Sequence, residues 1–126
     1  NPVYEDVVAD VYTSLNSTAD RLVAKGLDAN LICLDPGIGF GKTLTHNLEL
    51  LHSRSESNYS ILWGVSRKSI FAQLLNREDT EQRLAGTLGV AAHAMLEGVD
   101  LLRVHDVEAH SDLLTTMATL RPELDQ

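Results

Sequence analysis

Three clusters of polar residues in this sequence could bind a charged ligand. Asp35 follows one short apolar run, and the cationic segment 66–69 follows another. The third cluster, Arg103, His105 and Asp106, lies at the end of a third apolar run. An arginine and a histidine two residues apart in an extended segment lie on the same side, and such a pair suits phosphate or pyrophosphate oxygens. A carboxylate at a strand end needs a partner, either ligand N–H groups or a nearby cation. The three clusters therefore predict a ligand site with an anion-binding part.

The glycine-rich stretch LDPGIGFGKT (34–43) ends like a nucleotide-binding loop but lacks the pattern of one. A P-loop needs a glycine where this sequence has Pro36, and proline has a fixed φ and no N–H to offer a phosphate. The dinucleotide pattern GxGxxG also fails, because Lys42 stands at the place of its third glycine. We therefore interpret the glycines as allowing a tight turn with Phe40 at its rim, and Lys42 as no phosphate lysine.

Simpler structural roles compete with binding at several of these positions. Asp35 precedes proline and could only initiate a turn, and Asp106 is more typical of a helix cap than of a catalytic group. Arg67 and Lys68 could be surface charges, although the helix macrodipole disfavours cations just ahead of a helix and an anionic ligand would explain them. Ser69 could cap that helix or bind a carboxylate at its N-terminus.

The other histidines lie in expected helical segments, without HExxH or a comparable spacing, so we expect structural or solvent-facing roles and no metal. They are His46, His52, His93 and His110.

Composition predicts a soluble globular domain and limits its partners. The chain has 126 residues, 44% of them hydrophobic, and a net charge of −8, which argues against nucleic acid. No apolar run approaches the roughly 20 residues of a membrane span. The opening NPVYEDVV shows no signal peptide and no initiator methionine, so we expect a piece of something longer. One cysteine, Cys33, allows neither an internal disulfide nor a cysteine-based zinc site; we expect a buried structural thiol and a cytoplasmic location.

The elements that must position these residues alternate between helices and strands. Residues 1–26 predict a helix with Asn1 as cap, Pro2 in the first turn and Gly26 as stop. Its apolar stripe is expected to comprise Val3, Val7, Val11, Leu15, Leu22 and Val23. Short apolar runs then predict strands over 31–35, 61–65 and 101–104. Helices are expected over about 45–55, 69–75, 80–97 (with Gly98 as its stop) and 107–120.

Apolar strands joined through helices predict a parallel α/β sheet. A (β/α)8 barrel needs eight such units in about 250 residues, and this chain supplies three plus a leading helix. We therefore expect the C-terminal part of such a barrel, with a small self-contained α/β domain as the alternative. Because the carboxyl ends of parallel strands lie on one face, the polar clusters should converge there.

The segments LDPGIGFGK (34–42), GVSRKS (64–69) and LRVHDV (102–107), in that order and spacing, resemble dihydropteroate synthase of folate biosynthesis. The likeness covers essentially all 126 residues and falls on the last three strands of that (β/α)8 enzyme. The pterin-binding domain of cobalamin-dependent methionine synthases is related, but SRKS followed by RVHD is more similar to the synthase. The resemblance implies one partial pterin-binding barrel domain over 1–126.

The resemblance also implies the substrates. The family condenses 6-hydroxymethyl-7,8-dihydropterin pyrophosphate with p-aminobenzoate, which gives dihydropteroate and pyrophosphate. Asp35 matches the family's pterin-binding carboxylate, and Phe40 matches the phenylalanine that lines the pocket. Ser69 matches the serine near the carboxylate of p-aminobenzoate. Gly64, which opens the second motif, is a further expected substrate-binding residue.

A catalytic role is implied for Lys68, Arg103 and His105, which are also expected to bind substrate. Lys68 matches the lysine that reaches the pterin ring near p-aminobenzoate, and the other two match the pair that grips the anion. Departure of pyrophosphate leaves positive character on the pterin methylene, so the site must stabilise the leaving anion while it holds the ring. The aniline nitrogen then attacks, and no covalent enzyme intermediate is needed.

The first strands of the family have no counterpart in this sequence. The resemblance implies Mg2+ as cofactor, with its asparagine ligand in that N-terminal half, and a sulfonamide target. We expect weak pterin binding and no detectable catalysis by the chain alone, unless a complementing N-terminal half is supplied. Exposed strand edges favour association, and the family's homodimer contacts use helices from this part. A non-catalytic paralogue, or a fragment that keeps only the dimer surface, is the competing hypothesis.

Overall fold

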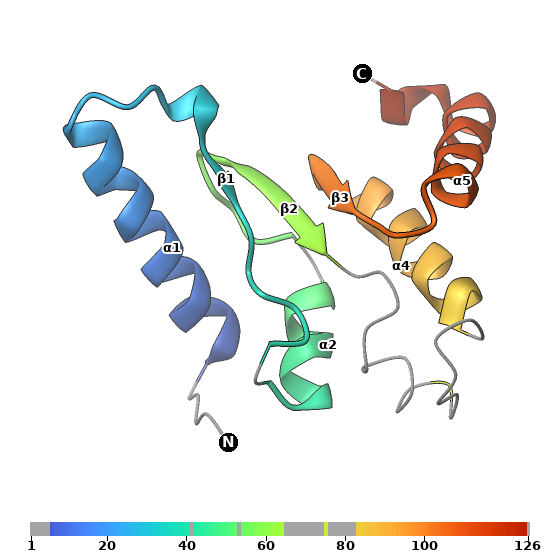
Figure 1. The fold of residues 1–126 in the computed structure, drawn as a ribbon, viewed down its shortest axis with the longest axis horizontal. Coiled ribbons are helices and arrows are strands. Elements are labelled where there is room, and N and C mark those ends of the chain that lie inside the picture. Colours follow the sequence, from blue (N-terminus) through green and yellow to red (C-terminus); the bar gives the residue numbers. More distant parts are fainter. Residues whose placement is uncertain (1–5, 41, 53, 65–74, 76–82, 126) are drawn as a thin grey trace.

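The computed structural model describes residues 6–40, 42–52, 54–64, 75 and 83–125 (Figure 1). Within them the elements, in chain order, are the helix α1 (Val7–Ala24), the 3-10 helix η1 (Ala29–Leu31), the strand β1 (Cys33–Leu34), the helix α2 (Leu44–His52), the strand β2 (Ser60–Gly64), the helix α4 (Leu84–Glu97), the strand β3 (Leu101–Arg103), the helix α5 (Val107–Leu120) and the 3-10 helix η3 (Pro122–Asp125). No helix in these ranges is both long and apolar enough to cross a bilayer.

The three described strands form a parallel sheet in the order β1-β2-β3, as predicted. In the view of Figure 1, β2 runs between its two neighbours, with α1 to the left of the strands and α4 and α5 to the right. Leu34 pairs with Ile61, and Gly64 pairs with Arg103. The first strand is shorter than the expected 31–35, because Leu31 belongs to η1. All three strands therefore end toward one edge, which we call the carboxyl edge.

The two faces of the sheet differ sharply in burial. Leu34, Ile61 and Trp63 lie on one face and are at most 5% exposed in the core, packed among buried residues of α1, α2 and α4. Side chains alternate along a strand, so the other face carries Cys33, Ser60, Leu62 and Leu101. We call this second group the bare face, because its members are exposed or half-buried.

The prediction that Cys33 is a buried thiol is wrong. Cys33 is exposed, and its neighbour Leu34 occupies the core position. The apolar run 31–34 suggested burial of every residue, whereas alternation in the strand sends Cys33 to the bare face. Residual desolvation raises the pKa of this thiol, and the carboxylates of Asp100 and Asp35 add to the shift.

The leading helix begins later than predicted. Asp6 is its N-cap and accepts a hydrogen bond from the amide of Ala9 at 3.1 Å, so the helix starts at Val7. Asn1, Pro2 and Val3 lie outside the described residues. The stop at Gly26 is confirmed: α1 ends at Ala24, and Gly26 adopts a positive φ of 107°.

The buried stripe of α1 is only partly as predicted. Val7 is buried and Val11 and Leu15 are half-buried, but Leu22 and Val23 are 43% and 37% exposed. Tyr12 and Ala19 are buried in their place. The buried positions therefore end one turn before the helix does.

The later helices follow the prediction closely. The helix expected over 107–120 has those bounds, and α4 ends before Gly98, whose φ of 76° suits a helix stop. The helix expected over 45–55 spans Leu44–His52. Of the helix expected over 69–75, only Leu75 lies within the described residues. Asp106 takes the N-cap position of α5, but its side chain makes no capping hydrogen bond.

At the opposite, amino edge of the sheet, polar contacts serve the fold. The carboxylate of Asp100 accepts hydrogen bonds from the amide of Ile61 at 2.8 Å and from Arg54 at 3.2 Å. The amide of Asp100 donates to the carbonyl of Ile61 at 3.0 Å. The hydroxyl of Tyr59 donates to Asp20 on α1 at 2.5 Å, which raises the pKa of Tyr59 because the phenolate could not donate. These contacts join the beginning of β2 to α1 and to the residue that precedes β3.

Asp100→Ala should lower the free energy of unfolding by about 1–3 kcal/mol, because the buried amide of Ile61 loses its acceptor. Chemical denaturation measures the change. Asp112→Ala is the matched control, since Asp112 is an exposed carboxylate on α5, and it should change stability by less than about 0.5 kcal/mol. Equal losses in the two variants would show that Asp100 does not hold the strands.

Candidate functional site

The carboxyl edge brings Gly64 and Arg103 together across β2 and β3. The two residues are partners in the parallel register. A Cβ built on Gly64 would lie 3.3 Å from both Nε and Nη2 of Arg103. The guanidinium therefore lies over the glycine, in space that any larger residue would occupy. Arg103 itself is exposed.

Asp35 lies at the same edge, directly after β1. One carboxylate oxygen accepts a hydrogen bond from the amide of Gly37 at 2.9 Å, the pattern of an Asx turn. The turn-initiating role is therefore present. Asp35 is exposed, so water can solvate its carboxylate and the predicted need for a ligand or cation partner does not arise. An exposed carboxylate with one oxygen in a turn keeps acceptor capacity for a ligand.

Lys42 bonds to the glycine-rich loop itself. Its Nζ donates to the carbonyl of Gly37 at 2.8 Å and to that of Phe40 at 3.1 Å. Burial lowers the pKa of Lys42, and the carboxylate of Asp35 partly offsets that effect. These two bonds give Lys42 a structural role within the loop, in keeping with the rejection of a phosphate-binding lysine.

Asn47 holds the same loop from α2. It is only 4% exposed, and its Oδ1 accepts from the amide of Gly39 at 2.8 Å. Asn47 is not among the site residues predicted from the sequence. A signal existed, because Asn47 stands three residues after Leu44 and three before Leu50 on the apolar side of the helix, where a polar group needs a partner.

Phe40 stands at the rim of the edge. Its side chain is 62% exposed, while its amide donates to the carbonyl of Gly37 at 3.0 Å. Gly37 and Gly39 adopt positive φ values of 72° and 89°, which glycine tolerates without strain. The loop therefore turns tightly, as the glycines predicted, and the side chain of Phe40 is exposed at this turn.

His105 follows β3 by two residues and is exposed, as Arg103 is, whereas the intervening Val104 is half-buried. The strand itself ends at Arg103, so the expected shared side of the pair stays a prediction. Lys68, Ser69 and the rest of 66–69 lie outside the described residues, so their predicted place at this edge stays a prediction.

Two of the other histidines have structural contacts, as expected. Nε2 of His93 lies 2.6 Å from the carbonyl of Leu51, and its ring stacks on Trp63 with centroids 6.1 Å apart. Nδ1 of His110 lies 2.8 Å from the carbonyl of Asp106. A carbonyl only accepts, so both of these ring nitrogens carry the proton.

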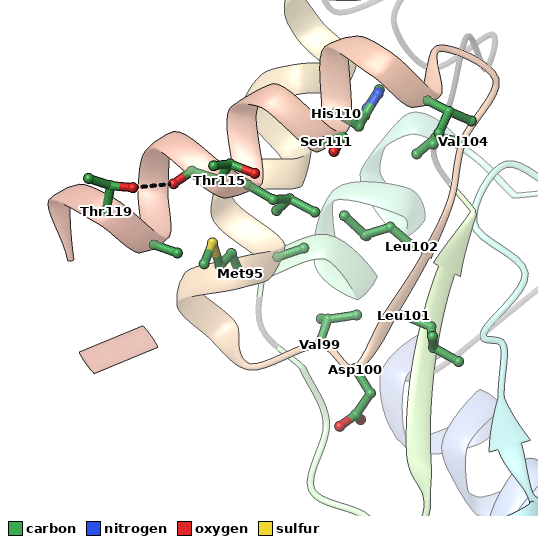
Figure 2. Close-up of a pocket in the computed structure, with 14 residues that line it drawn as sticks. Met95, Val99, Asp100, Leu101, Leu102, Val104, His110, Ser111, Thr115 and Thr119 are labelled. Atoms are coloured by element: carbon green, nitrogen blue, oxygen red, sulfur yellow. Dashed lines mark hydrogen bonds between the residues drawn. The ribbon is translucent and has the colours of Figure 1, made fainter. Parts of the chain in front are cut away.

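A cavity of about 870 Å³ opens between α4, β3 and α5 (Figure 2). Its lining is mostly apolar and includes Met95 from α4, Leu102 from β3 and Leu114 from α5. Neither Arg103 nor His105 lines it. The cavity is therefore separate from the carboxyl edge, and it lies beside β3, the end strand of the described sheet.

Gly64→Ala should displace the guanidinium of Arg103, because the new methyl group would lie within 3.3 Å of it. A shift of the Arg103 Nε–H resonance in an NMR spectrum measures this. Gly89→Ala is the control, since Gly89 lies in α4 with open space at its Cβ; it should leave that resonance in place and stabilise the helix by up to about 1 kcal/mol. An unmoved resonance in Gly64→Ala would contradict the close approach.

The assembled edge offers three kinds of interaction from described residues. Asp35 offers a carboxylate for ligand N–H groups, Phe40 an aromatic face for a flat ring, and Arg103 with His105 a site for anionic oxygens. A planar heterocycle that carries a phosphate or pyrophosphate matches this combination.

The chain is similar in sequence to known dihydropteroate synthases. The chain is 40% identical over 124 residues to the dihydropteroate synthase of Neisseria meningitidis serogroup C, with 95% of this chain and 44% of that protein covered. It is 42% identical over 110 residues to that of Escherichia coli K12, with 85% and 39% covered. The chain thus spans less than half the length of these relatives.

Solved structures of dihydropteroate synthases share the fold. The enzyme from Xanthomonas albilineans in complex with 7,8-dihydropteroate superposes with a TM-score of 0.90 at 38% identity, with 95% of this chain and 47% of that chain covered. The Thermus thermophilus enzyme in complex with 4-aminobenzoate gives 0.85 at 41% identity, with 94% and 49% covered. These likenesses support the expected partial barrel. The family described as "Pterin binding enzyme" matches residues 1–105, and the chain belongs to that family.

Proposed function

We propose that this chain supplies the carboxyl-terminal half of a dihydropteroate synthase site. The reaction would join 6-hydroxymethyl-7,8-dihydropterin pyrophosphate to p-aminobenzoate and release pyrophosphate. The observation that carries the proposal is the parallel register, which sets Arg103 over Gly64 at the edge where Asp35 follows β1. One ligand could therefore meet the carboxylate and the cation together.

In this proposal Asp35 accepts hydrogen bonds from the pterin ring, and Phe40 lines the ring's pocket. Both residues belong to the loop at the carboxyl edge, where the carboxylate and the aromatic face are exposed. Ser69, outside the described residues, would bind the carboxylate of p-aminobenzoate. These contacts orient the reacting methylene toward the incoming aniline nitrogen.

Arg103 and His105 act on the leaving group. The guanidinium offers a permanent charge and the imidazole a hydrogen bond to pyrophosphate oxygens, so negative charge that develops on the leaving group is stabilised as the carbon–oxygen bond breaks. The aniline nitrogen supplies the electron pair for the new bond and then loses a proton. Lys68, outside the described residues, would reach the pterin ring beside this pair.

We propose that the remainder of the family's barrel covers the bare face in the complete enzyme. Parallel sheets are normally covered on both faces, and Leu101 on this face is 51% exposed. A homodimer through α4 and α5 is also proposed, since Leu96 and Leu120 on these helices are 50% and 73% exposed. The proposed cellular location is the cytoplasm, where the exposed thiol of Cys33 would stay reduced.

The resemblance to the synthases also implies Mg2+. The described residues include no group of three or more histidine, cysteine, aspartate or glutamate side chains that could hold a metal ion. These residues do not by themselves fit the ion. We propose that Mg2+ would be held by substrate oxygens and by residues outside this chain.

The proposal can be tested by titrating the 15N-labelled chain with a hydroxymethylpterin and, separately, with pyrophosphate. Asp35→Asn should weaken pterin binding by about tenfold or more, since a charged hydrogen-bond acceptor is lost, and should leave pyrophosphate binding unchanged. Arg103→Gln should weaken pyrophosphate binding and leave pterin binding unchanged. Changes in amide resonances at the carboxyl edge measure both affinities.

Two variants at exposed positions away from this edge are the controls. Asp28→Asn lies ahead of η1, and Arg121→Gln lies after α5; both should bind the two ligands as the unsubstituted chain does. Pterin binding that survives Asp35→Asn would refute the role of Asp35. If Asp35→Asn or Arg103→Gln bound neither ligand, that variant would be unfolded and would not report the loss of a single contact.

A further inference from the structure

We propose that Asn47 and Lys42 are positioning residues for the candidate site. They hold the loop 35–40 so that Asp35 and Phe40 face the ligand, although neither residue needs to touch it. The inference rests on the proposed function for the identity of the ligand. The restraint of the loop can be measured without any ligand.

Asn47 ties the loop to the core of the fold. Its Oδ1 accepts from the amide of Gly39 at 2.8 Å, and the side chain is 4% exposed. An acceptor buried on a helix is fixed by the packing of that helix, and Leu50 and Leu51 of α2 belong to the core. The position of Gly39 is therefore set by Asn47 of α2, which lies eight residues further along the chain.

Lys42 ties the loop to itself. Its Nζ donates to the carbonyls of Gly37 and Phe40 at 2.8 and 3.1 Å. The carbonyl of Gly37 also accepts from the amide of Phe40 at 3.0 Å. Because Gly37 and Phe40 are bridged by two donors, the turn between them closes, and the aromatic ring keeps a defined place at the rim.

The same peptide unit connects Lys42 to Asp35. The amide of Gly37 donates to the carboxylate of Asp35 at 2.9 Å, while the carbonyl of Gly37 accepts from Lys42. Gly37 has a φ of 72°. Without these hydrogen bonds, a glycine could adopt many other backbone conformations as well. Loss of either anchor would therefore free the turn that orients the Asp35 carboxylate.

A carboxylate held in its binding orientation costs less entropy when the ligand arrives. Loosening the loop should thus weaken binding of the pterin, which meets Asp35 and Phe40. Binding of pyrophosphate should not change, because Arg103 and His105 belong to β3 and the segment after it. A residue with only a general structural role would weaken both ligands together.

The test compares four variants of the full chain. Asn47→Leu removes the acceptor at nearly constant size, and Asn47→Asp keeps it. Lys42→Met removes the donor from a half-buried position, and Lys25→Met is the matched control, because Lys25 is an exposed lysine after α1. Amide hydrogen exchange at Gly39 and Phe40 reports the loop, and NMR titrations report the pterin and pyrophosphate affinities.

We expect Asn47→Leu and Lys42→Met to speed exchange at these two amides by about tenfold, the factor for one lost hydrogen bond. Pterin affinity should fall by about the same factor, with pyrophosphate affinity unchanged, while Asn47→Asp and Lys25→Met behave as the unsubstituted chain. If Asn47→Leu fails to fold, Lys42→Met decides alone, since its side chain is outside the core.

Unchanged exchange in Lys42→Met and Asn47→Leu would overturn the proposal. Faster exchange without a loss of pterin affinity would also overturn it, because the loop would then be held without being needed. An unsubstituted chain that binds no pterin, but whose loop responds as expected, would support the restraint and count against the proposed function instead. An equal loss of both ligands would assign the two residues to general stability.

Discussion

The parallel register of β2 and β3 is the constraint on which the rest of the site depends. It sets Gly64 opposite Arg103, and a Cβ built on the glycine would lie only 3.3 Å from the guanidinium. The same strand direction carries Asp35 to that edge after β1. At the other end of the strands, Asp100 accepts from the amide of Ile61 and secures the pairing. The stabilising contacts and the proposed ligand site thus lie at opposite edges of one sheet.

The unequal faces of the sheet explain how a partial barrel can be ordered and still incomplete. Ile61 and Trp63 are fully buried on the helix side, so the packing of α1, α2 and α4 holds the strands without help from the bare face. Leu101 and the cavity beside β3 remain open to further protein. A ligand bound at the carboxyl edge would therefore meet half of its surroundings here, which agrees with a chain that spans less than half of its relatives.

Sequence patterns predicted the parallel sheet and most helix bounds, because apolar runs and helix stops are local signals; Gly26 and Gly98 show this with their positive φ values. Contacts between distant elements were harder. Cys33 was misassigned because the run LICL does not say which face each residue takes. The start of α1 was predicted too early, because Asn1 is as good a helix cap by residue type as Asp6, the N-cap of the structure. Asn47 was overlooked because its partner, Gly39, belongs to a loop rather than to its own helix.

We propose that the Asp35 loop and Arg103 bind the same ligand. The most direct measurement is a titration of the labelled chain with an intact pterin pyrophosphate, in which the amide of Gly37 and the Nε–H of Arg103 are followed in the same spectra. Because one carboxylate oxygen of Asp35 is bonded to Gly37, that amide reports the loop. Both resonances should move along one binding curve with a common midpoint. Separate midpoints, or movement of only one resonance, would contradict the account.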